Sequence, residues 1–64
     1  MDIRTALAGM SPVPGSCVVN ISVEFGDEVM IISVLVPEQV SDEQKKVLAI
    51  GRAKGLARKF GNLP

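Results

Sequence analysis

An alternating stretch followed by a glycine turn constrains the fold of this chain more than any other feature. Over residues 17–25 apolar and polar side chains alternate, so that every second one lies on the same face of an extended strand. Gly26 and Asp27 follow, and a leading glycine suits a type II′ turn because that position needs a positive φ. Residues 29–36 are again mostly apolar, and Pro37 ends the run. The pattern predicts a β-hairpin.

The two-residue turn also determines how these strands pair. It sets Val23 opposite Met30, and the following pairs on the same face are Ile21–Ile32, Val19–Val34 and Cys17–Val36. All of these pairs are apolar, as one buried face requires, whereas a shift by one residue would bring Asn20 and Ser22 onto that face. The strand at 29–36 is apolar on its other face as well, which is typical of a strand with neighbours on both edges.

The last third of the chain predicts a helix that packs across the hairpin. Ser41 and Gln44 form a capping box, and Gly61-Asn62 is a stop signal after Phe60. One face of this helix gathers its apolar residues, which are Ala49, Ile50, Ala53, Leu56, Ala57 and Phe60. We expect this face to cover the hairpin and to form a core whose main members are Ile21, Ile32, Val34, Ile50, Leu56 and Phe60.

The N-terminal residues give a weaker pattern. Over residues 1–10 the apolar positions, from Ile3 to Met10, have the spacing of one helical face. Residues 11–16 contain two prolines and a glycine, which indicate a turn or loop. The expected fold is therefore a single α+β domain over residues 1–64. It consists of a short N-terminal helix or coil, a β-hairpin and a long C-terminal helix packed across the hairpin.

The small size of the chain favours association with a second copy. A domain of 64 residues buries only about 60% of the surface that its unfolded chain exposes. A single cysteine excludes an internal disulfide, and histidine, the commonest metal ligand, is absent. We therefore expect a homodimer in which the strand at 29–36 pairs with its symmetry mate, giving a four-stranded antiparallel sheet.

Residue types that carry catalysis are scarce. The chain contains no His, Tyr or Trp, and Cys17 has no histidine to activate it, so we expect a buried small hydrophobe there. The carboxylates Glu24, Asp27 and Glu28 at the hairpin turn are expected to be solvated. We expect no enzyme activity, catalytic residue, metal or cofactor. The apolar runs are too short to span a membrane and no basic leader opens the chain, so a cytoplasmic location without a membrane partner is expected.

Charge is strongly segregated along the chain. Residues 1–44 hold all seven acidic residues, and residues 45–64 hold six of the seven basic ones. On a helical projection the cations form two rows, with Gly51 and Gly55 between them, and each glycine costs a helix about 1 kcal/mol relative to alanine. Close approach of another helix, of the sheet or of a phosphate backbone would offset this cost. The candidate partner-binding residues on this outer face are Val47, Leu48, Gly51, Arg52, Lys54, Gly55, Arg58 and Lys59.

These patterns predict a small, non-enzymatic, homodimeric interaction or regulatory module that contacts a partner protein through its C-terminal helix. The alternative is a nucleic-acid-binding protein that uses the same basic helix. A net charge of zero and the absence of aromatic residues outside the predicted core argue against nucleic acid, whereas doubling the helix cations in a dimer argues for it. A third possibility is a subunit of a higher oligomer.

Overall fold

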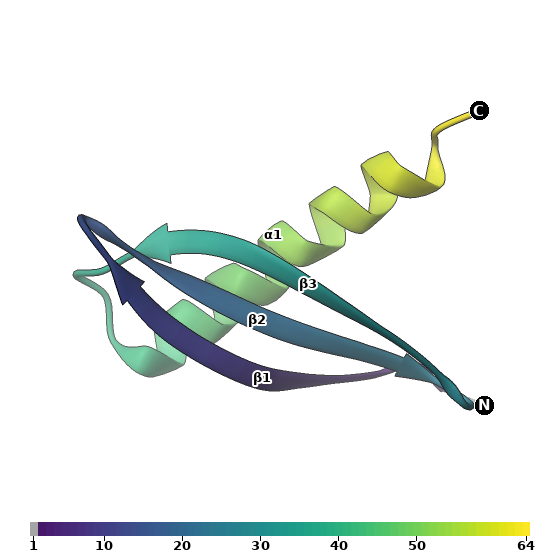
Figure 1. Ribbon diagram of the computed structural model, residues 1–64, viewed down its shortest axis with the longest axis horizontal. Coiled ribbons are helices and arrows are strands. Elements are labelled where there is room, and N and C mark those ends of the chain that lie inside the picture. The colour runs from purple at the N-terminus through teal and green to yellow at the C-terminus, as the bar shows by residue number, and fades with distance from the viewer. Residues whose placement is uncertain (1) are drawn as a thin grey trace.

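A three-stranded antiparallel sheet with a helix on one face makes up the described part of the chain, residues 2–64 of the computed structural model (Figure 1). The elements are β1 (Arg4–Val13), β2 (Ser16–Phe25), β3 (Glu28–Pro37) and α1 (Asp42–Gly61). The sheet order is β1-β2-β3, and α1 packs on β2 and β3. The α+β class is therefore confirmed, with one more strand than predicted.

The predicted hairpin is confirmed in its limits, turn and register. Val23 pairs with Met30 and Ile21 with Ile32, and the same register continues to the far end of both strands. Gly26 has a φ of 62°, and no residue other than glycine has a positive φ among those described, which fits the type II′ turn. The register could be predicted because the polar residues Asn20 and Ser22 mark the face of β2 that does not meet the helix.

The predicted N-terminal helix or coil is wrong, because residues 4–13 form β1, which pairs with β2. Of the turn or loop predicted over residues 11–16, only the turn at Pro14 and Gly15 is confirmed. The register shifts between Leu7 and Gly9, and this bulge inserts one extra residue into the strand. Leu7 and Met10 consequently lie on the same face although they are three positions apart, which imitates helical spacing. A turn at Pro14 and Gly15, whose φ is 78°, joins β1 to β2.

The core lies between α1 and the sheet. Its buried members are Cys17, Val19, Ile21, Ile32, Val36, Ala49 and Ala53, with Val34 and Ile50 partly buried against them. Two predicted core residues are not buried, because Leu56 is 50% and Phe60 66% exposed. The reason is geometric: α1 crosses the sheet diagonally and its C-terminal half extends past β3 (Figure 1). The correct helix face was identified, but the sheet ends before that face does.

The limits of α1 follow from its caps. The Ser41 hydroxyl accepts a hydrogen bond from the backbone N–H of Gln44 at 3.2 Å, as the capping-box pattern predicts. At the other end the N–H of Asn62 donates to the carbonyl oxygens of Arg58 and Lys59. Within residues 2–64, no helix has the length and apolar character needed to cross a membrane.

Candidate interaction surfaces

The outer face of α1, predicted as the partner site, is open. A Cβ placed at Gly51 or Gly55 would meet no other atom within 4 Å, so no described segment packs over these glycines. Val47 is 71% exposed and Leu48 is 40% exposed beside them. The structure thus brings this part of the predicted site together on one surface. The close neighbour that would offset the cost of the glycines is not supplied by residues 2–64.

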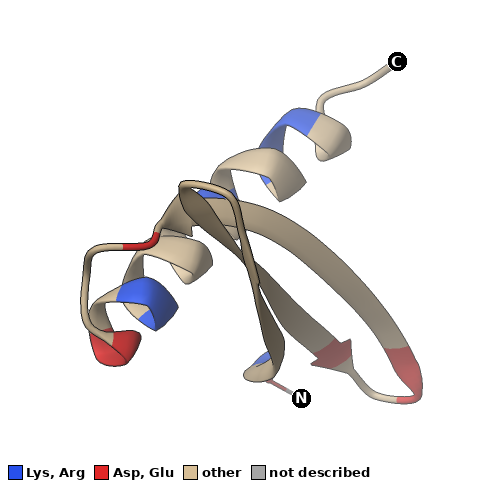
Figure 2. Cartoon of the chain, turned by 60° about the vertical axis from the view of Figure 1, so that its left-hand side comes forward, with Lys and Arg blue, Asp and Glu red and all other residues tan. Residues whose placement is uncertain are grey.

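The basic residues of α1 do not all belong to that surface. Arg52 Nη1 donates a 2.7 Å hydrogen bond to the carbonyl oxygen of Leu35 in β3. Lys54 and Arg58 line an apolar hollow of about 410 Å³ between α1 and the sheet. Arg52, Lys54 and Arg58 therefore flank the contact between helix and sheet. Figure 2 shows the basic residues of α1 spread along the helix, away from the acidic hairpin tip.

The free edge of β3 offers a row of backbone hydrogen-bonding groups. In a hairpin closed by a two-residue turn, alternate residues bond to the neighbouring strand and the others direct their N–H and C=O outward. The outward residues of β3 are Val29, Ile31, Ser33 and Leu35. The carbonyl of Leu35 is the one outward group that has a hydrogen-bond partner among residues 2–64, namely Arg52. The edge is thus open from Val29 to Ser33.

An apolar hollow runs beside the open part of this edge. It has a volume of about 360 Å³, and its lining comes from Met30, Ile31, Ile32, Ser33, Leu56, Ala57 and Phe60. We call this set of residues the β3 edge site. Its roof is the part of α1 that extends past the sheet, and its floor is the strand edge. The strand part of this site could be predicted, because the two apolar faces of residues 29–36 indicated a strand with neighbours on both edges.

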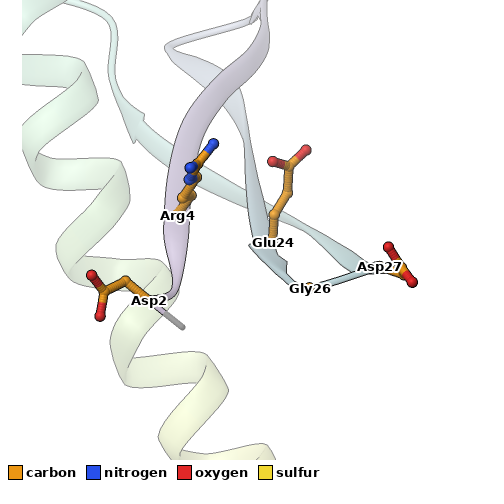
Figure 3. Close-up of a pocket in the computed structure, with 5 residues that line it drawn as sticks. All are labelled: Asp2, Arg4, Glu24, Gly26 and Asp27. Carbon is orange, nitrogen blue, oxygen red and sulfur yellow. The ribbon is translucent and has the colours of Figure 1, made fainter.

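The hairpin tip carries a polar hollow of about 500 Å³. Arg4 and Glu24, which pair across β1 and β2, point to the same side of the sheet, while Asp2 and Asp27 point away in opposite directions (Figure 3). No group of three or more His, Cys, Asp or Glu side chains placed to hold a metal occurs within residues 2–64. These exposed carboxylates do not converge on a common point, so the tip lacks the geometry of a binding site.

The molecule exposes more surface than is typical of a monomeric globular protein of its mass. Its accessible surface is 4892 Å², whereas a monomeric globular protein of 6.8 kDa exposes about 4,000 Å². The excess of roughly 900 Å² is close to the ~800 Å² that each partner buries in a standard protein–protein interface. Much of it is apolar, because the sheet face opposite α1 exposes Val29, Ile31 and Leu35 by 60%, 61% and 52%.

No family model matches the chain, and no match was found among curated proteins or solved structures.

Proposed function

We propose that the chain is a small, non-enzymatic interaction module that forms a homodimer by pairing the β3 edges of two copies. The observation that carries this proposal is the overhang of α1 beyond β3. Leu56 and Phe60 continue the helix face that is buried at Ala49 and Ala53, yet they are 50% and 66% exposed. They lie in the C-terminal half of α1, which extends past β3 (Figure 1). A strand added to β3 occupies the place beneath them.

Strand addition satisfies both parts of the β3 edge site at once. The outward N–H and C=O groups between Val29 and Ser33 gain partners, which removes the hazard that an open edge presents. Alternate side chains of the added strand pack beneath Leu56 and Phe60 and remove their apolar surface from water. Because each chain forms three strands, the dimer has a six-stranded sheet rather than the four-stranded one expected from the sequence.

A proline scan of the two sheet edges tests this proposal. Ser33→Pro deletes an outward N–H of β3 without touching the bonds to β2, and Thr5→Pro is the matched change on the outer edge of β1. We expect the parent and Thr5→Pro to sediment as dimers in the micromolar range. Ser33→Pro should raise the dimer dissociation constant by about tenfold or more.

Ser33→Ala serves as a further control for the proline variant. The Ser33 hydroxyl donates a 2.6 Å hydrogen bond to Asn20 Oδ1, and alanine removes this bond while keeping the backbone N–H. Dimerisation equal to that of the parent is expected. A parent chain that stays monomeric throughout the micromolar range, or a Ser33→Pro variant as dimeric as the parent, contradicts the proposal.

In the dimer the outer faces of both α1 helices are available to a partner protein. A twofold axis perpendicular to the sheet puts the two helices on the same side, so the exposed Val47 and Leu48 of each copy face the same direction. The apolar character of these residues favours a protein partner over nucleic acid. Retention on heparin that falls steeply with salt would instead support the nucleic-acid alternative, which relies on the remaining cations of α1.

A further inference from the structure

We infer that the two β3 strands pair antiparallel with Ile31 on the twofold axis. This inference rests on the proposed dimer and specifies its register. Val29 then lies opposite Ser33 of the partner subunit, and Ile31 lies opposite its own symmetry mate. On the helix side, Met30 lies opposite Ile32 of the partner subunit, beneath the overhanging helix ends.

The hydrogen-bond pattern of β3 limits the registers that are possible. Only Val29, Ile31, Ser33 and Leu35 direct backbone groups outward, so these residues must face one another across the axis. Placing Ile31 on the axis gives three directly opposed pairs, two between Val29 and Ser33 and one between the two copies of Ile31. An axis nearer to Val29 gives fewer pairs, because the Gly26-Asp27 turn then replaces strand residues at the interface.

Arg52 disfavours the registers on the other side. An axis at Ile32 or Ser33 requires Leu35 to pair with the partner, and its carbonyl oxygen already accepts the 2.7 Å hydrogen bond from Arg52 Nη1. The incoming N–H would have to share this oxygen with Arg52 or displace it, whereas an axis at Ile31 leaves the contact unchanged.

The position of the β3 edge site supports the same register. The hollow extends over Met30, Ile31, Ile32 and Ser33, so an axis at Ile31 makes the hollows of the two copies face one another. Leu56 and Phe60 of each copy then cover the strand of the other. This register therefore covers Leu56 and Phe60, which are 50% and 66% exposed in the single chain.

Disulfide trapping tests the register. Cys17, the one cysteine of the chain, is replaced by alanine, and single cysteines are introduced as Val29→Cys, Ile31→Cys and Ser33→Cys in the full chain. A disulfide needs Cα atoms about 4.4–6.8 Å apart, whereas an offset of four residues along a strand is roughly 13 Å. Circular dichroism confirms that each variant is folded before mild oxidation.

We expect Ile31→Cys to give about tenfold more covalent dimer than either other variant alone. A mixture of Val29→Cys with Ser33→Cys should form the mixed disulfide as readily as Ile31→Cys forms its own. Self-linking of Val29→Cys or Ser33→Cys, in a protein that still sediments as a dimer, overturns the register and leaves the proposed function intact. Absence of any covalent dimer together with monomeric sedimentation overturns both.

Discussion

At the scale of single residues, α1 carries two kinds of small residue on opposite faces, alanines against the sheet and glycines facing outward. Ala49 and Ala53 are 0% and 3% exposed and let the helix lie close to the sheet. Gly51 and Gly55 lie on the other side of the helix, where no described atom approaches. The alanines are therefore explained by packing within the chain, whereas the glycines reduce helix stability without a gain in the described residues.

Replacing Gly51 by alanine should therefore stabilise the fold. The new methyl group meets no neighbour within 4 Å, and alanine is favoured over glycine in a helix by about 1 kcal/mol. Urea unfolding should show a gain of roughly 0.5–1 kcal/mol. A loss of stability would mean that another copy or another segment packs against this glycine.

At the scale of secondary-structure elements, the hairpin and α1 were predictable because their patterns are regular. The alternation of β2, the two-residue turn that follows it and the capping box at Ser41 each depend on neighbours close in sequence. β1 was not predictable in the same way, because its bulge interrupts the alternation between Leu7 and Gly9. For the β3 edge site, the two apolar faces of residues 29–36 indicated the strand but not its helix neighbours. The angle at which α1 crosses the sheet decides which apolar residues of α1 stay exposed, and this angle could not be predicted from the sequence.

Shortening a side chain buried beneath α1 and shortening one on the exposed end of α1 should have different effects. Ile32 is 8% exposed beneath α1, and Ile32→Ala should cost roughly 2–5 kcal/mol of unfolding free energy. Phe60 is 66% exposed, so Phe60→Ala should change the stability of the dilute monomer by less than about 1 kcal/mol. It should nevertheless weaken the dimer, because Phe60 lines the β3 edge site.

Denaturation at high dilution, combined with sedimentation of the same variants, separates these effects. A Phe60→Ala chain that unfolds as easily as Ile32→Ala even when monomeric would show that Phe60 belongs to the core of the single chain. A Phe60→Ala chain that dimerises as well as the parent would place the interface elsewhere.

At the scale of the whole molecule, the chain is a thin plate, with extents of 35 × 25 × 15 Å. A plate covered by a helix on one face only has a small core for its surface, which accounts for its large accessible area. Folding and association are expected to be linked, because binding a second copy stabilises only the native chain.

The melting temperature should therefore rise with protein concentration. Since dimer formation favours the folded state by mass action, a series of calorimetric scans over a wide concentration range should show a steady upward shift. The Ser33→Pro variant is the control, and its melting temperature should begin to rise only at concentrations about tenfold higher or more, because its dimer is weaker. A parent protein with a constant melting temperature would argue against linkage.

The two edges of the sheet differ, and this difference determines how far pairing between copies extends. On the outer edge of β1, Pro12 has no N–H to offer, and the bulge between Leu7 and Gly9 bends the strand. A growing filament needs every copy to present two receptive edges. If two copies pair through β3 as proposed, that edge is used in both, so the assembly closes at two chains and the outer β1 strands resist further growth into fibres.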